Sequence, residues 1–161
     1  MNTYLADSML GKLCRWLRIL GYSVEYVTSD IDDDQIVNQT VGHSSVLLTR
    51  DRELSRRYGN AILFDDDDLL KQIRSIVRRD PPDPSLFFTR CPLCNTILEK
   101  RDPEDLNGLV PDGVRKRGLD IYHCPKCGKV YWKGSHYDSM LKKIELFLGE
   151  SGNESFKERK F

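Results

Sequence analysis

Residues 3–21 have the sequence TYLADSMLGKLCRWLRILG, which holds a complete strand-and-helix unit. The apolar run Thr3–Ala6 predicts a short strand, and the residues from about Ser8 to Leu20 predict a helix whose leucines line one face. Gly21 follows at the position where helices commonly end. Asp7 lies between the two elements, so that an acid directly follows the first strand.

The same alternation of strand and helix continues along the first half of the chain. Three further strands are predicted at Val24–Val27, Val46–Thr49 and Ala61–Phe64. Three further helices are predicted at about Asp33–Val41, Asp51–Tyr58 and Asp68–Arg79. The strands are short and continuously apolar, as strands buried on both faces are. Alternating strands and helices favour right-handed crossovers, so we predict an α/β fold with a mostly parallel sheet flanked by helices.

A proline-rich stretch, Asp80–Pro84, ends this pattern. Three prolines within five residues cannot continue a helix, and they favour a stiff, extended spacer. We therefore predict an α/β domain over residues 1–80 and a small domain over residues 86–148, which ends in an amphipathic helix. Residues 149–161 are polar and charged, and we expect them to be disordered.

The composition excludes some classes of protein and leaves others open. With 161 residues, of which 39% are hydrophobic and 31% charged, the chain suits one ordinary soluble domain and a small one. The formal net charge is zero, so any contact with nucleic acid must come from local patches. No apolar run reaches the roughly 18 residues that span a bilayer, and the N-terminus lacks the features of a signal peptide. We expect a cytosolic (cytoplasmic) protein without a membrane partner; its oligomeric state is not specified.

Four of the five cysteines form two Cys-x-x-Cys pairs, Cys91 with Cys94 and Cys124 with Cys127. Two residues between cysteines allow both thiolates of a tight turn to face one ion, and two such turns complete a closed tetrahedral site. We predict a structural zinc ion in a zinc ribbon with four cysteine ligands. A redox dithiol and an iron–sulfur cluster are the alternatives, but a thioredoxin-like motif requires a single pair at a helix start.

The remaining cysteine and the zinc ribbon each lead to a further expectation. Cys14 lies within an apolar helical pattern and is expected to be a buried side chain without chemistry. The zinc ribbon is too small to bury much apolar surface, so metal binding should supply much of its folding free energy. Metal removal is accordingly expected to unfold residues 86–140 while most of the N-terminal sheet stays folded.

Acidic residues follow every predicted strand of the first half. They are Asp7, the group Asp30, Asp32, Asp33 and Asp34, then Asp51, and the run Asp65–Asp68. The carboxyl ends of parallel strands share one edge of a sheet, where ligands bind in such folds. Carboxylates that converge repel one another unless a cation neutralises them, and Mg²⁺ or Mn²⁺ prefers such oxygen ligands. These ions polarise a phosphodiester and lower the pKa of a bound water.

Capping is an alternative role for some of these aspartates. Aspartates at strand ends and helix starts are common as caps, and capping is the favoured explanation for the run Asp65–Asp68. Asp7 and Asp51 are the stronger candidates for a functional site. Basic residues expected near the same edge, where they would contact phosphates, are Lys12, Arg15, Arg18, Arg50 and Arg52.

Four stretches of the chain resemble the Mut7-C domain family. They are Leu5–Tyr22, Leu47–Leu54, Arg90–Cys94 and Cys124–His136, and the resemblance covers about residues 3–140 in order. It implies a PIN-like nuclease fold with an attached zinc ribbon. It also implies three or four acids around Mg²⁺ or Mn²⁺ that serve to cut single-stranded RNA.

The family pattern assigns roles by motif. Asp7 matches the acid that ends the first strand, and Asp51 matches the acid after a later strand. Asp33 matches the acid that opens the helix between them, with Asp34 as a near rival. The fourth acid remains open between Glu53 and residues 65–67. The resemblance thus implies catalytic roles for Asp7, Asp33, Asp34 and Asp51, Mg²⁺ or Mn²⁺ binding by Asp7, Asp33 and Asp51, and substrate binding by Lys12, Arg15, Arg50 and Arg52.

The function predicted from the sequence is therefore that of a metal-dependent ribonuclease acting on single-stranded RNA. Two alternatives from other classes stay open: an RNA-binding zinc-ribbon module without catalysis, and an adaptor for protein interactions that keeps only the fold. The RNA target and the polarity of cutting are not specified.

Overall fold

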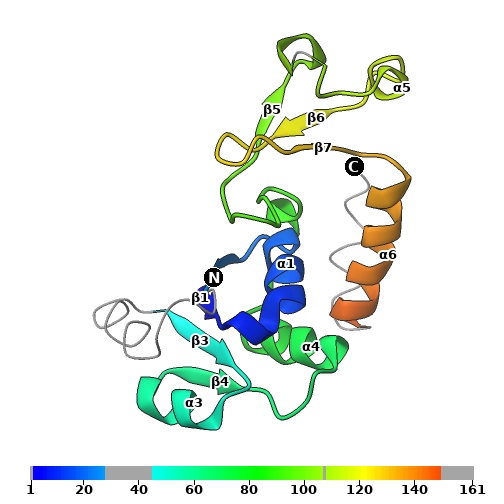
Figure 1. Ribbon diagram of the computed structural model, residues 1–161. Coiled ribbons are helices and arrows are strands. Elements are labelled where there is room, and N and C mark those ends of the chain that lie inside the picture. Colours follow the sequence, from blue (N-terminus) through cyan, green and yellow to red (C-terminus); the bar gives the residue numbers. More distant parts are fainter. Residues whose placement is uncertain (1, 28–44, 107, 150–161) are drawn as a thin grey trace. The chain divides into compact units, whose positions relative to one another are not determined.

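The computed structural model describes residues 2–27, 45–106 and 108–149 (Figure 1). The chain forms two compact units, Met1–Asn95 and Thr96–Phe161. The first unit extends past the proline-rich stretch and includes the first cysteine pair. The domain bounds 1–80 and 86–148 remain a prediction. Within the described residues, no helix has the length and apolar character needed to span a membrane.

The first unit contains a four-stranded parallel sheet with the strand order β2-β1-β3-β4. The strands are β1 (Thr3–Ala6), β2 (Ser23–Tyr26), β3 (Val46–Thr49) and β4 (Ala61–Leu63). The helices are α1 (Gly11–Ile19), which follows a 3₁₀ turn at Ser8–Leu10, α3 (Arg52–Tyr58) and α4 (Leu69–Arg79). This confirms the predicted α/β fold. The helix predicted at Asp33–Val41 lies outside the described residues.

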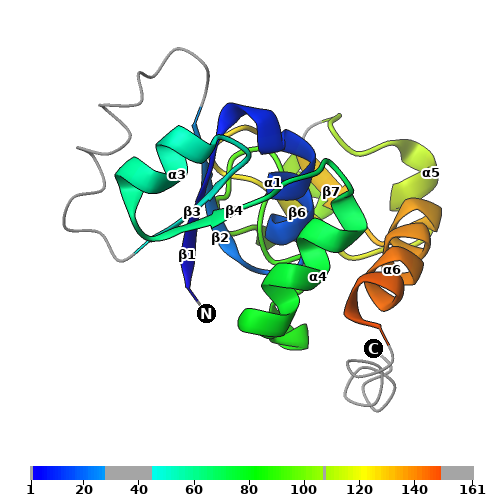
Figure 2. The ribbon, with the colours of Figure 1, turned by 90° about the horizontal axis from the view of Figure 1, so that it is seen from below.

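The register of the sheet assigns alternate residues to its two faces. Leu5, Leu47 and Ala61 lie opposite one another across three strands and pack against Leu54 and Tyr58 of α3. The next register row holds Ala6, Leu48 and Ile62, all buried. Helices α1 and α4 contact each other and lie on the other side of the strands from α3 (Figure 2). The sheet is thus covered on both faces, as its continuously apolar strands require.

The segment after α4 is tied to this unit. The Asp80 carboxylate accepts hydrogen bonds from the Asn2 backbone N–H at 2.8 Å and from the Tyr4 hydroxyl at 3.1 Å. Burial, followed by the charge of Asp80, raises the pKa of Tyr4 to about 12. Further along, the Phe88 N–H donates to the Ile19 carbonyl at 2.8 Å. Residues 80–88 therefore pack against β1 and the end of α1.

Gly21 is the point at which this segment comes closest to α1. Its φ is +89°, and a Cβ built on it would lie 2.6 Å from the Cβ and 2.7 Å from the carbonyl oxygen of Leu86. A residue with a side chain would have to adopt a strained backbone and displace the turn at Pro84–Leu86. Glycine is required here for both reasons.

The second unit is built on a small antiparallel sheet with the order β5-β6-β7. Its elements are β5 (Glu99–Arg101), a 3₁₀ turn at Pro103–Leu106, α5 (Asp112–Arg115), β6 (Ile121–His123), β7 (Val130–Trp132) and α6 (Ser135–Leu148). One apolar cluster contains buried Leu106, Val110 and Ile121, with Val114 and Val130 packed against it. So small a cluster stabilises the unit only modestly.

We predict that Gly21→Ala destabilises the protein more than Gly59→Ala does. Gly59 also has a positive φ, +78°, but no atom of the described residues lies within 4 Å of its Cβ position. Gly59→Ala should lower the free energy of unfolding by about 1–2 kcal/mol through backbone strain alone. Gly21→Ala should cost roughly 1–3 kcal/mol more because of the contact with Leu86. Urea unfolding followed by circular dichroism measures both, and equal losses would contradict the close approach.

Candidate active site and metal centre

The strand order creates a switch point between β1 and β3. The chain passes from β1 to β2 on one side and then places β3 on the other side of β1. In open parallel sheets, ligands bind outside the carboxyl ends of the two strands that flank such a point. Asp7 directly follows β1, and Asp51 lies two residues beyond the end of β3. Both acids therefore belong to the edge at which this fold binds ligands.

Asp7 carries a buried carboxylate held by three hydrogen bonds. The residue is 6% exposed. Its Oδ1 accepts from the Met9 N–H at 2.9 Å, which caps the turn at Ser8–Leu10. Its Oδ2 accepts from the Thr49 hydroxyl and from the Arg50 N–H, the latter at 3.2 Å. These donors compensate for the loss of water around a buried charge.

Thr49 connects the two acids. It is fully buried, and its hydroxyl donates to Asp7 while accepting from the Asp51 N–H at 2.9 Å. Asp51 is exposed, and its Oδ1 caps α3 by accepting from Glu53 N–H at 2.7 Å and Leu54 N–H at 2.9 Å. One hydroxyl thus fixes the loops after β1 and β3 relative to each other. Thr49 is not among the site residues predicted from the sequence; the available signal is a hydroxyl residue at the last strand position, two residues before the acid.

Other candidate acids differ in their exposure and in their hydrogen bonds. Asp33 and Asp34 lie outside the described residues, so their proposed roles stay predictions. Asp68 caps α4 by accepting from the Leu70 and Lys71 N–H groups, which confirms the expected capping role for this member of the run. Asp66 accepts from the Asp68 N–H, which together with Lys71 lowers the pKa of Asp66. Asp65 and Glu53 are exposed, and Asp65 pairs with Arg52.

Of the predicted basic contacts, four are at least partly exposed to solvent. Lys12 and Arg15 are exposed on α1, Arg50 is half-buried beside Thr49, and Arg52 is exposed in the first turn of α3. The ion pair between Arg52 and Asp65, with a distance of 3.0 Å, joins two well-exposed side chains. Such a pair is weak and exchanges readily for another anion.

The prediction for Arg18 was wrong. This residue was placed with the phosphate-binding side chains, but it is 4% exposed. Its Nε donates to the Val24 carbonyl at 2.8 Å, and its Nη1 donates to the carbonyls of Pro92 and Leu93 at 3.2 and 2.8 Å. The physical reason is that the segment around the first cysteine pair covers this side of α1. A position that faces solvent on an isolated helix is therefore buried in the fold.

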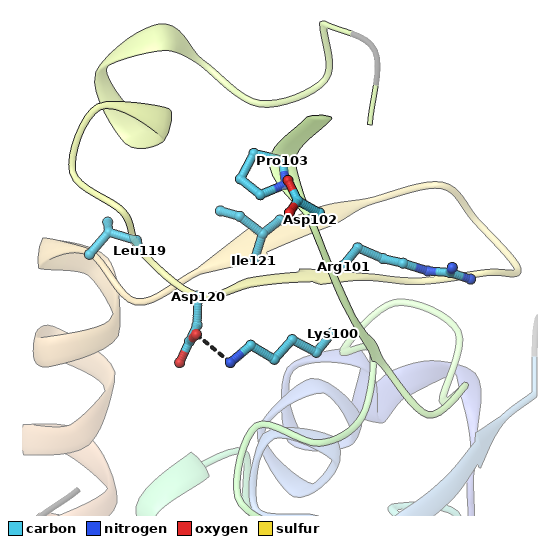
Figure 3. A pocket seen from close by; sticks show the side chains of 7 residues that line it. All are labelled: Lys100, Arg101, Asp102, Pro103, Leu119, Asp120 and Ile121. Atoms are coloured by element: carbon cyan, nitrogen blue, oxygen red, sulfur yellow. Dashed lines mark ion pairs between the residues drawn. The ribbon is translucent and has the colours of Figure 1, made fainter. Parts of the chain in front are cut away.

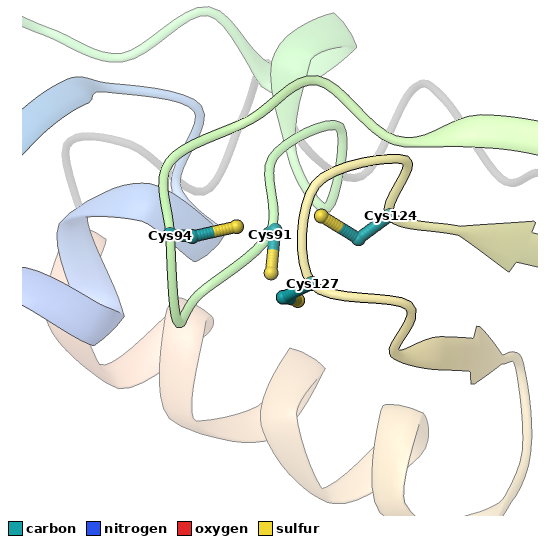
Figure 4. A group of neighbouring side chains, drawn as sticks. All are labelled: Cys91, Cys94, Cys124 and Cys127. Atoms are coloured by element: carbon teal, nitrogen blue, oxygen red, sulfur yellow. The ribbon is translucent and has the colours of Figure 1, made fainter.

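The four cysteines of the two pairs come together (Figure 4). Their sulfur atoms all lie within 4.8 Å of one another. The two turns share a backbone pattern, since the Asn95 N–H donates to the Cys91 carbonyl at 3.0 Å and the Gly128 N–H donates to the Cys124 carbonyl at 2.9 Å. Four thiols in this arrangement match the donor set of a closed, tetrahedral zinc site. The predicted four-cysteine cluster is confirmed.

The carboxylates do not form a second cluster of this kind among residues 2–27, 45–106 and 108–149. Within those residues, only the cysteines bring three or more candidate ligands within reach of one ion. A catalytic metal site at the β1–β3 edge accordingly depends on a third acid, for which Asp33 and Asp34 are the predicted sources. Cys14 stands apart from the cluster, because it is buried and burial raises its pKa to about 11. The expected burial of this side chain is confirmed.

A hollow in the second unit is a weaker candidate for a site (Figure 3). It is lined by Lys100, Arg101, Asp102, Pro103, Leu119, Asp120 and Ile121. Lys100 pairs with Asp120 at 2.6 Å, and this hydrogen bond lowers the pKa of Asp120. The lining has two cations and two carboxylates, so it offers no excess charge for a phosphate.

The fold and its sites define a small α/β protein with acids at a parallel-sheet switch point and a four-cysteine metal centre. The model of the Mut7-C RNAse domain matches residues 2–144, and the chain belongs to this family. Membership suggests a ribonuclease and implies RNA as the substrate. Comparisons with curated proteins and with solved structures found no match.

We predict that Thr49→Val lowers the free energy of unfolding by about 1–3 kcal/mol. The change keeps the shape of the side chain but removes a donor from the buried Asp7 carboxylate. Thr89→Val is the matched control, because the Thr89 hydroxyl donates to the Leu86 carbonyl in an exposed hydrogen bond whose loss should cost less than about 0.5 kcal/mol. Urea unfolding measures the difference, and equal midpoints would show that the Thr49 link contributes nothing.

We predict that the purified protein contains about one zinc ion per chain. Cys91→Ala should reduce this content at least about fivefold, because three thiolates no longer close the site. Cys14→Ala removes a buried thiol outside the cluster and should leave the content unchanged. Elemental analysis of the three proteins after dialysis provides the measurement, and an equal loss in both variants would argue against the assigned ligands.

Proposed function

We propose that this protein is a metal-dependent ribonuclease that hydrolyses phosphodiester bonds of single-stranded RNA. Family membership supports the reaction class. The observation that carries the proposal at the level of residues is the Thr49 hydroxyl, which joins the Asp7 carboxylate to the Asp51 backbone at the switch point. It holds two acids from different strands at one edge of the sheet.

Asp7, Asp51 and Asp33, with Asp34 as the alternative to Asp33, are the proposed ligands of Mg²⁺ or Mn²⁺. When bound, such ions supply a water of lowered pKa and stabilise the charge that develops on the phosphate. A carboxylate has about four lone-pair sites, and the hydrogen bonds of Asp7 occupy three of them. The described hydrogen bonds of Asp51 all use Oδ1, which leaves Oδ2 for an ion.

Thr49 acts in this proposal as a positioning residue. Its hydroxyl orients the Asp7 carboxylate, and hydrogen bonds of this kind to metal-binding groups support metal affinity. Lys12 and Arg15 from α1, together with Arg50 and Arg52 after β3, are the proposed phosphate contacts that orient the RNA strand.

A second candidate function is RNA binding or protein interaction without catalysis. Asp7 caps a 3₁₀ turn and Asp51 caps α3, so both side chains have structural roles that need no metal ion. The two functions differ in what the negative charge of Asp51 does. A cap needs only an oxygen acceptor, whereas a metal ligand for nuclease chemistry needs the charge as well.

We therefore predict that Asp51→Asn lowers the rate of RNA cleavage on the order of 100-fold. Asparagine caps helices as well as aspartate does, so α3 should remain intact. Asp68→Asn is the matched control, because Asp68 caps α4 in the same way and holds no proposed metal. Cleavage of an end-labelled single-stranded RNA in Mn²⁺ measures the rates, with unfolding midpoints and zinc contents recorded for each variant.

Two results would contradict the nuclease proposal. One is cleavage by Asp51→Asn at the rate of Asp68→Asn, and the other is cleavage that does not depend on added Mn²⁺ or Mg²⁺. RNA binding without metal that survives Asp51→Asn, in the absence of any cleavage, would favour the binding module instead.

A further inference from the structure

Two side chains form hydrogen bonds with the backbone at the outer edge of the sheet. Among the described strands, β2 is at the edge of its sheet, and edge strands present backbone N–H and C=O groups that no other strand satisfies. At Val24 both groups have partners: the N–H donates to Asn95 Oδ1 at 3.1 Å, and the carbonyl accepts from Arg18 Nε at 2.8 Å. Both partners are nearly buried, with 6% of Asn95 and 4% of Arg18 exposed.

Both side chains also connect β2 to the first cysteine turn, defined as residues 91–95. Asn95 is the last residue of this turn. Its side-chain nitrogen, Nδ2, also donates to Ser23 Oγ at 3.2 Å and to Glu25 Oε1 at 2.8 Å. Arg18 donates to the carbonyls of Pro92 and Leu93, the two residues between Cys91 and Cys94. The edge of β2 is thus bonded to the backbone of a metal-binding turn.

The second cysteine turn, residues 124–128, provides an internal comparison. Gly128 takes the place that Asn95 has in the first turn, with φ of +72° against +66° and the same backbone hydrogen bond to the first cysteine. The metal-binding turn itself therefore requires a residue that tolerates positive φ, and glycine suffices. The turn itself does not need the Asn95 side chain, and every hydrogen bond described for that side chain is to a residue of β2.

We propose that the first cysteine turn is a metal-dependent clamp on β2, through which Asn95 and Arg18 couple zinc occupancy of the four cysteines to the edge of the parallel sheet. Both are positioning residues that act on the zinc site through the turn. The proposal does not depend on whether the protein cuts RNA.

Two physical arguments support the coupling. A turn whose two thiolates face one ion has a defined shape only while the ion is held, and the carbonyls that Arg18 contacts belong to that shape. In addition, zinc with four thiolates carries a net charge of about −2, so a buried guanidinium beside the turn stabilises the loaded site. By linkage, a clamp that zinc stabilises must in turn strengthen zinc binding by the same factor.

This coupling revises an expectation from the sequence. Zinc removal was expected to unfold residues 86–140 and to leave the N-terminal sheet mostly folded. With the clamp, zinc removal should loosen β2 as well. The centre of the sheet should stay folded; there the Asp7 N–H donates to the Leu48 carbonyl at 3.1 Å.

The decisive variant is Asn95→Gly, which gives the first turn the residue of the second and removes only the side chain that reaches β2. Gly128→Asn is the matched control, because nothing in the described part of the chain lies within 4 Å of the Gly128 Cβ position and asparagine tolerates positive φ. Zinc affinity of the full chain is measured by competition with a chromophoric chelator. Hydrogen exchange is measured at the Val24 amide and, as an internal reference, at the Asp7 amide.

We expect Asn95→Gly to bind Zn²⁺ about 10-fold more weakly and to exchange the Val24 amide at least about 10-fold faster, with the Asp7 amide unchanged. Zinc removal from the unaltered protein should have the same effect on Val24, and Gly128→Asn should change neither quantity. Arg18→Met should also weaken zinc binding, whereas Arg78→Met, the same change at an exposed arginine of α4, should not.

Three results would overturn the proposal. The first is equal protection of the Val24 amide with and without zinc, and the second is unaltered zinc affinity in Asn95→Gly. The third is an equal loss of affinity in Gly128→Asn, which would assign the effect to the turn backbone rather than to the side chain on β2.

Discussion

The parallel pairing of β1 with β3 is the constraint on which the first unit depends. Both strands are four residues long and largely apolar, and Ala6 lies opposite Leu48 in their register. A slip by one residue would exchange the side chains that face α3 with those that face α1 and α4, so the register is strongly determined. The same register brings Asp7 to Thr49. The candidate site is therefore a direct consequence of how the sheet is packed.

The polar residues at this edge can serve both a structural and a chemical purpose. Asp7 and Asp51 both cap the elements that follow them, and the Thr49 hydroxyl satisfies one while accepting from the other. Buried polar groups are tolerated only when their partners are in place, which makes such a network rigid. Rigid carboxylates are also what a metal-dependent hydrolase requires of its ligands. Capping and metal binding are thus compatible uses of the same two acids.

The four-cysteine cluster matters because the second unit is small. The described apolar cluster of the small antiparallel sheet has three buried members, too few to stabilise a domain without further help. We expect metal ligation to supply that stability. Hydrogen bonds of Asn95 and Arg18 connect the first cysteine turn to β2. A side chain on the first helix and one beside a metal ligand together protect the edge strand from unwanted pairing.

The amino-acid sequence by itself determined the α/β class, the boundaries of the described strands and helices of the first unit to within about three residues, the four cysteines and the resemblance to the family. These features follow from short-range periodicity and motif spacing, which neighbouring residues alone specify. It also indicated that Asp7 and Asp51 share an edge, because parallel strands align their carboxyl ends. The tertiary structure alone decided that Arg18 is buried, that Thr49 links the two acids and that Asn95 reaches β2. Each of these depends on which segment covers which face of the fold, and that is set by contacts between residues far apart in the chain.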